Sequence, residues 1–196
     1  MNIDYTFNKV QKNSILIFLI FFVFLFFYFF KFHSNINFDK QEYEKIIQES
    51  NFNKKNSIKN VIKFIENNHN NVYSTLASLY LSNMYAKNNF LYYAIVILQK
   101  NKKYIFDENI LNIVTLNIAK MQLHLNDKNS ALKTLDGITC ITWNSIKHDI
   151  KGDIFISRNN VKKAISEWKK SIYYQNKEEL KEIIKIKLKN FEQKYN

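Results

Sequence analysis

The 196-residue chain contains no proline, two glycines and one cysteine. Glycine-rich loops that bind phosphate groups are thereby excluded, because such loops need several glycines close together. The scarcity of glycine and proline instead favours helices joined by short connections. The single cysteine, Cys140, cannot form a disulfide within the chain. We expect it to be a half-buried small apolar residue rather than a nucleophile.

Residue patterns that carry out catalysis or bind metals are also missing from the sequence. The four histidines are scattered, and none has a His-x-x-x-His or Cys/His ligand spacing: His33, His69, His124 and His148. The Gly-x-Ser-x-Gly motif of serine hydrolases does not occur. The sequence therefore predicts no enzyme, no metal site and no cofactor. An enzyme with an unrecognised site is the alternative, and no residue in the sequence points to one.

The charge of the chain is strongly basic, with 29 Lys and Arg against 17 Asp and Glu and a formal net charge of +12. A basic helical protein can bind nucleic acid. However, the lysines are spread over most of the chain, and Arg158 is the single arginine. A codon bias towards AT-rich sequence explains the excess of lysine without a partner. We therefore expect solvated basic surfaces, some of which could face an anionic membrane, and no nucleic acid partner.

One long hydrophobic run stands near the N terminus, from Ile15 to Phe30. As a helix it would span roughly 24 Å, and its flanks bring it close to a hydrocarbon core of about 30 Å. We predict a transmembrane helix over residues 14–32 that contacts the lipid bilayer. A short tail at residues 1–13 precedes it and a linker at residues 33–38 follows it.

A cleaved signal peptide is the competing interpretation of this segment. The run is longer than the usual hydrophobic region of about 7 to 15 residues, and no small-x-small cleavage site follows Phe30. The segment should therefore remain attached as an anchor. Its orientation stays open from lysine counting, since Lys9 and Lys12 precede the run and three lysines follow it closely. The shortness of the tail favours a cytoplasmic N terminus, because long domains are translocated largely regardless of charge.

A repeated pair of small residues, twelve positions apart, organises the remainder of the chain. The pairs are Ser82 with Ala94, Ala119 with Ala131, and Gly152 with Ala164. The second members are separated by 37 and then 33 positions. Two antiparallel helices cross closely where both present a small side chain, and this spacing is typical of tetratricopeptide repeats. The alternative is three unrelated helical hairpins whose small residues coincide by chance.

Other positions of each unit agree in phase with this interpretation. Large residues follow the small ones at Tyr85, Gln122, Phe155, Leu98, Leu135 and Trp168, and only Gln122 is polar. Each polar break contains asparagine, at Asn88-Asn89, Asn126-Asp127 and Asn159-Asn160, which suits turns and helix caps. The sequence thus predicts an all-α fold in which about three helix pairs form a solenoid.

Further amphipathic segments flank the three pairs. Residues 39–50 and 57–66 are expected to form an irregular helix pair that caps the array on the membrane side. At the other end, Glu178 to Phe191 places its apolar residues on one stripe, as a terminal capping helix requires. The whole of residues 39–196 is therefore predicted to be one tetratricopeptide-repeat-like domain.

Three segments resemble a known family, the YfgM family of ancillary subunits of the bacterial SecYEG translocon. They are YSTLASLYLSNMYAKNN from Tyr73, DENILNIVTLNIAKMQLHLNDKNSALKTLDGI from Asp107 and DIKGDIFISRNNVKKAISEWKKSI from Asp149. The resemblance implies a single-span inner-membrane protein with a cytoplasmic N terminus and a periplasmic repeat domain. It also implies association with the translocon and with a membrane-anchored periplasmic chaperone of the prolyl-isomerase type (PpiD-like). Such an adaptor would help newly exported proteins reach periplasmic chaperones.

The family pattern supplies no catalytic or ligand residues, so candidate binding residues come from repeat geometry. The first helix of each pair lines the concave groove of such an array. Its inward positions hold Asn83 and Lys87, then Lys120 and His124, then Asp149 and Asp153. We expect a groove that is basic at one end and acidic at the other, although the same residues could be ordinary solvated side chains. The alternative function is a membrane-tethered scaffold for another cell-envelope assembly, with the same anchor and repeats.

Overall fold

The computed structural model describes residues 20–28, 31, 38–50, 54–69 and 71–195, with side chains described as far as residue 192. The chain divides into two compact units, residues 1–49 and residues 50–196. In the first unit, residues 20–28 and 38–49 are helical. All nine residues from Ile20 to Tyr28 are exposed.

The predicted anchor at residues 14–32 lies only partly within the described residues, which include 20–28 and 31. Its two outer residues, Ile15 and Phe30, are among those not described, as are the tail at residues 1–13 and most of the linker at residues 33–38. Within the described ranges, no helix combines the length and the apolar character that crossing a membrane requires.

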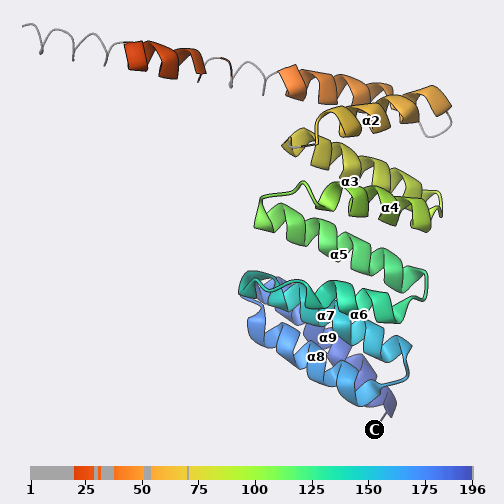
Figure 1. Cartoon of the computed structure of the whole chain (residues 1–196). Coiled ribbons are helices and arrows are strands. Elements are labelled where there is room, and N and C mark those ends of the chain that lie inside the picture. The colour runs from red at the N-terminus through yellow and green to blue at the C-terminus, as the bar shows by residue number, and fades with distance from the viewer. Residues whose placement is uncertain (1–19, 29–30, 32–37, 51–53, 70, 196) are drawn as a thin grey trace, which may run out of the picture. The chain divides into compact units, whose positions relative to one another are not determined.

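The second unit is a stack of α-helices that pack in chain order (Figure 1). Its helices are α2 (Lys55–Asn67), α3 (Val72–Lys87), α4 (Leu91–Lys102), α5 (Glu108–His124), α6 (Lys128–Asp136), α7 (Asn144–Ser157), α8 (Val161–Tyr174) and α9 (Glu178–Tyr195). A 3-10 turn, η1 (Ile141–Trp143), precedes α7. Each helix packs on the one before it, and the pairs α3/α4, α5/α6 and α7/α8 are the predicted repeats. The all-α, tetratricopeptide-like architecture of this part of the chain is thus confirmed.

The small residues lie where the helices of each pair cross. The three second members, Ala94, Ala131 and Ala164, are fully buried. The Ser82 hydroxyl donates a hydrogen bond of 3.1 Å to the Ala94 carbonyl oxygen, so the first crossing also satisfies a buried polar group. At the third crossing, a Cβ atom on Gly152 would lie within the Trp168 indole, 2.8 Å from Cε2 and closer still to Nε1 and Cδ1. The fully buried Trp168 ring therefore occupies the space that a side chain at position 152 would need.

The asparagines predicted at the turns adopt the left-handed conformation. The three φ angles are 64° at Asn89, 61° at Asn126 and 57° at Asn159. In the first turn, the Phe90 amide donates to the Tyr85 carbonyl at 2.9 Å and the Asn89 amide donates to the Ala86 carbonyl at 3.0 Å. This pair of bonds is a Schellman motif, which satisfies the last carbonyl groups of a helix. The same two bonds recur at the ends of α5 and α7, so all three repeats turn in the same way.

Gln122, the polar residue at a position expected to be large and apolar, is buried and has a partner. Its Oε1 accepts a hydrogen bond of 2.7 Å from the Thr134 hydroxyl on α6. The second helix of the same repeat therefore supplies the group that makes a glutamine tolerable at this position.

The helices α2 and α9 pack on the two ends of the repeats, whereas the other helix of the predicted N-terminal cap, at residues 39–50, lies almost wholly in the first unit and stays a prediction in that role. At the N-terminal side α2 packs on α3 and buries Val61, Phe64 and Ile65. At the C-terminal side α9 packs on α8, where Ile184 and Leu188 join the core around Trp168. The predicted stripe on α9 is only partly used, because Leu180 and Ile183 are exposed.

Candidate binding groove

A groove of about 780 Å³ opens between α3 and α5. It brings together four of the residues predicted from repeat geometry: Asn83, Lys87, Lys120 and His124. Asn83 and Lys87 lie one turn apart on α3, and Lys120 and His124 lie one turn apart on α5. All four side chains are exposed.

The groove also contains residues that the sequence reasoning missed. Tyr80 and Asn117 lie one turn before Asn83 and Lys120 on the same helices and line the same groove. They could have been found by extending each predicted stripe by one turn towards the N terminus. Ser82 and Asn89 also line the groove, and six further lining side chains are apolar: Leu79, Ala86, Leu91, Leu98, Ile113 and Met121.

Asp149 and Asp153, the remaining two predicted residues, lie elsewhere. Both are on α7, and both form ion pairs with Lys187 of α9, at 2.9 Å for Asp149. Lys187 also lies over the Trp168 ring, 5.0 Å from its centroid. The terminal capping helix thus engages the two carboxylates that were expected to form an acidic end of the groove.

The pKa values of this cluster reflect burial and pairing together. Burial raises the pKa of Asp153, and the hydrogen bond and charge of Lys187 only partly offset that rise. For Lys187, burial lowers the pKa, but the bonds to Asp153 and Asp149 outweigh it and leave the pKa raised. The cluster therefore holds the Lys187 ammonium in its charged form, which suits a contact between helices.

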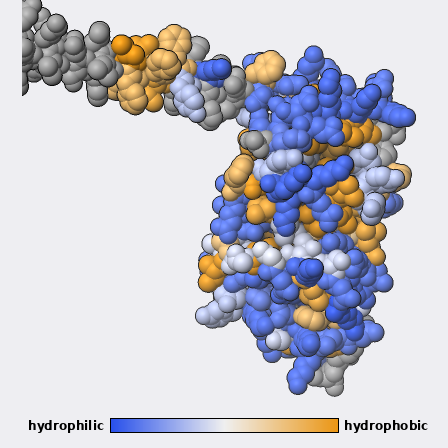
Figure 2. All heavy atoms as spheres, in the orientation of Figure 1, coloured by the Kyte–Doolittle hydropathy of each residue, from blue (hydrophilic) through white to orange (hydrophobic). Residues whose placement is uncertain are grey.

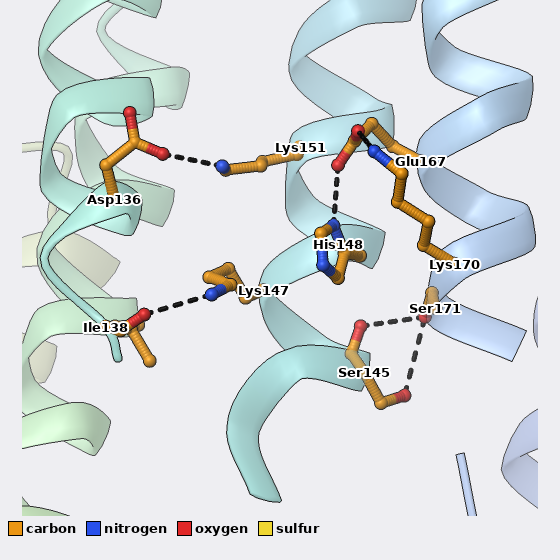
Figure 3. Close-up of polar contacts among 9 residues, drawn as sticks. All are labelled: Asp136, Ile138, Ser145, Lys147, His148, Lys151, Glu167, Lys170 and Ser171. Carbon is orange, nitrogen blue, oxygen red and sulfur yellow. Dashed lines mark hydrogen bonds and ion pairs between the residues drawn. The ribbon is translucent and has the colours of Figure 1, made fainter. Parts of the chain in front are cut away.

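A second polar cluster joins α6, α7 and α8 (Figure 3). His148 Nδ1 lies 2.6 Å from Glu167 Oε2, and Lys170 donates to the other oxygen of Glu167 at 2.6 Å. A histidine beside a carboxylate can act as a general base when it contacts a nucleophile. Here the nearby hydroxyls, Ser145 and Ser171, bond to each other, with the Ser171 hydroxyl donating to the Ser145 carbonyl at 2.7 Å. The geometry is that of a link between helices.

A further cavity of about 550 Å³ lies among α2, α3 and α4 and is lined mostly by apolar and aromatic side chains. At its edge the rings of His69 and Tyr104 stack with centroids 4.3 Å apart. The sequence reasoning did not anticipate this cavity, since three different helices contribute to its lining.

Comparison with known proteins shows what this arrangement belongs to. The family described as "Tetratricopeptide repeat-like domain" matches residues 8–193. An ancillary SecYEG translocon subunit from Buchnera aphidicola subsp. Acyrthosiphon pisum is 40% identical over 152 residues, which cover 78% of each chain. A second, from Buchnera aphidicola subsp. Schizaphis graminum, is 36% identical over 92% of this chain and 96% of that one. The chain belongs to the family of ancillary SecYEG translocon subunits.

The resemblance noted in the three sequence segments is therefore confirmed. The ancillary SecYEG translocon subunit of Escherichia coli is 32% identical over 137 residues, which cover 70% of this chain and 66% of that one. A crystal structure of MamA has a TM-score of 0.48 and 17% identity over 61% of this chain and 67% of that chain, a likeness too distant to inform function. In this member of the translocon-subunit family, four of the six predicted binding residues meet in the α3/α5 groove.

Proposed function

We propose that the chain is a membrane-anchored adaptor without catalytic activity that associates with the SecYEG translocon. Membership of the family of ancillary SecYEG translocon subunits carries this proposal. The repeat stack supports it, because solenoids of this kind present extended surfaces to partners. The His148–Glu167 and Ser145–Ser171 pairs, in the described residues, are engaged in bonds between α7 and α8.

The anchor is proposed to be the helix at residues 14–32, with the N terminus in the cytoplasm and residues 39–196 in the periplasm. The apolar run supports a contact with lipid, since nine consecutive residues from Ile20 to Tyr28 are exposed. Their hydrophobic surface stands out against the mostly hydrophilic face of the second unit (Figure 2). Exposing such a patch to water is unfavourable, and a bilayer would remove that cost.

In this proposal the repeat domain receives newly exported proteins at the translocon and passes them to a membrane-anchored periplasmic chaperone of the prolyl-isomerase type. The open α3/α5 groove supports the step that involves a partner, because it offers both apolar and hydrogen-bonding groups. No nucleic acid takes part.

Site-specific photo-crosslinking in bacterial inner membranes tests the proposal. A photo-reactive amino acid replaces Phe24 in the anchor in one variant and Asn83 in the groove in another. Both positions are exposed, so the substitutions should leave the fold intact. We expect adducts to translocon subunits from position 24, and to the periplasmic chaperone or exported proteins from position 83. Adducts to another envelope complex, with none to the translocon, would contradict the proposal in favour of a tethered scaffold.

A further inference from the structure

The α3/α5 groove carries positive charge without a matching negative charge. Its fourteen lining residues include Lys87, Lys120 and His124 but no aspartate or glutamate. Neither lysine forms a salt bridge with any described residue. The acidic residues nearest in the predicted pattern, Asp149 and Asp153, are bound to Lys187. The groove is therefore basic throughout rather than divided into a basic and an acidic end.

The helix dipole explains why some of these basic residues, but not all of them, stand at their positions. Lys87 and His124 stand in the last turns of α3 and α5, where a cation interacts favourably with the helix dipole. Lys120 lies one turn earlier on α5 and gains little from that effect, which is confined to the terminal turn. Its exposed ammonium faces the same groove as Lys87. Two lysines from different helices that line one groove, without a carboxylate in its lining, favour an anionic ligand.

The other lining residues of the groove favour an acidic polypeptide over other anionic ligands. Asn83 and Asn117 each offer both a donor and an acceptor, which matches the alternating groups of an extended peptide backbone. Ile113, 39% exposed, and the partly covered Leu79 and Leu91 give apolar contacts for a side chain. Phosphates are bound by cations and amide donors, so a phosphate site would use neither the apolar lining nor the asparagine carbonyl oxygens.

We propose that the α3/α5 groove binds an acidic segment of a partner polypeptide. Carboxylates of the segment pair with Lys87 and Lys120, its backbone bonds to Asn117, and an apolar side chain packs on Ile113. Asp149 and Asp153 of α7 do not add negative charge to this site, because they lie outside its lining and pair with Lys187 of α9. The inference rests on the proposed adaptor function for its partner and on the groove charge for its chemistry.

The experiment uses the full chain in membranes, with the photo-reactive amino acid at Asn83. Captured partner segments are identified by mass spectrometry, and their net charge is the readout. The paired change Lys87→Glu with Lys120→Glu should lower the adduct yield about tenfold or more, because two attractive contacts become repulsive. The matched control is Lys59→Glu with Lys63→Glu on α2, which changes the net charge equally at exposed positions outside the groove. Its yield should stay within about twofold of the parent, which separates a local from a general charge effect.

The outcomes distinguish this inference from the function on which it rests. Capture of net-acidic segments that is lost only in the groove variant supports it. Capture of neutral or basic segments, equal loss in the control, or adducts to lipid or nucleic acid would overturn it. Adducts from Phe24 report translocon contact independently, so their absence would count against the adaptor function while leaving the groove result readable. Thermal unfolding followed by circular dichroism confirms that both charge variants are folded, as expected for exposed lysines.

Discussion

At the scale of single residues, the packing of α7 on α8 depends on the absence of a side chain at Gly152. The Trp168 ring fills the space beside the Gly152 backbone, so α7 and α8 approach more closely than two larger residues would allow. The other two crossings use small side chains instead of a glycine: Ser82 with Ala94, and Ala119 with Ala131. Gly152 is therefore set by packing, and its backbone is ordinary helix.

Replacing Gly152 with alanine should lower the free energy of unfolding by about 1–3 kcal/mol, the usual cost of overpacking a core. Urea unfolding followed by circular dichroism measures it. Gly137→Ala is the comparison, since its φ is −69° and its Cβ would make one tight contact, 3.3 Å from the Thr134 carbonyl oxygen, in place of the much closer approach to the Trp168 ring. In a Trp168→Leu background the cost of Gly152→Ala should shrink, because the clashing ring is gone. An equal cost in both backgrounds would contradict the packing explanation.

How far the sequence predicts such details varies from residue to residue. The crossing positions and the turn asparagines could be predicted, because helix periodicity and the left-handed conformation are local properties of the chain. The partner of Gln122 could not, because Thr134 reaches it from the next helix. A polar residue in an apolar position signals that a partner exists without saying which one.

At the scale of helices, α7 and α8 are joined by polar bonds as well as by the core. His148 on α7 contacts Glu167 on α8, and the side chains are only 15% and 12% exposed. Burial raises the pKa of Glu167, but hydrogen bonds from Lys170 and His148 outweigh it, so the pKa lies below its usual range. The folded chain therefore holds this carboxylate in its charged form more firmly than the unfolded chain does.

Protonation of Glu167 should make the second unit less stable in acid. Because the folded pKa is the lower one, the unfolded chain binds more protons in the range between the two values. The contribution is complete above the ordinary glutamate value of 4.5 and is lost as the pH falls through the folded pKa. Glu167→Gln should cost about 1–3 kcal/mol at pH 7 and much less once the pH falls below the lowered folded pKa of Glu167. Denaturant unfolding at several pH values measures both, with the exposed Glu66→Gln as control; an unchanged acid slope in Glu167→Gln would count against this assignment.

Helix packing also explains why the structure differs from the predicted binding site. Four of its six residues meet in one groove, because helices α3 and α5 repeat the same face. Asp149 and Asp153 occupy similar faces of α7, yet Lys187 binds both from α9, with 38 positions separating Lys187 from Asp149. Periodicity places a residue on a face of its own helix, but it does not say which later helix will cover that face.

At the scale of the whole molecule, an apolar N-terminal run precedes a helical domain with a formal charge excess on the chain of +12. The hydrophobicity of a segment is local, so an anchor could be predicted from the sequence. The identity of a partner depends on a second molecule, and only the resemblance to a family could suggest one. The proposed adaptor can meet exported proteins only if its repeat domain lies on the periplasmic side of the membrane. The orientation of the chain therefore decides whether the proposal holds.

Cys140 provides a direct test of that orientation, because it is the single cysteine of the chain. Its thiol is half-buried in the connection between α6 and α7, with Sγ 3.0 Å from the Thr142 hydroxyl oxygen. If the repeat domain is periplasmic, a membrane-impermeant maleimide should label Cys140 in intact spheroplasts about as fully as after detergent treatment. Cys140→Ala should abolish the label, and adding Thr139→Cys to it should restore labelling at an exposed neighbouring position. Labelling of Cys140 and of the cysteine at position 139 only after detergent would place the domain in the cytoplasm, where it could not meet exported proteins, and the adaptor proposal would fail.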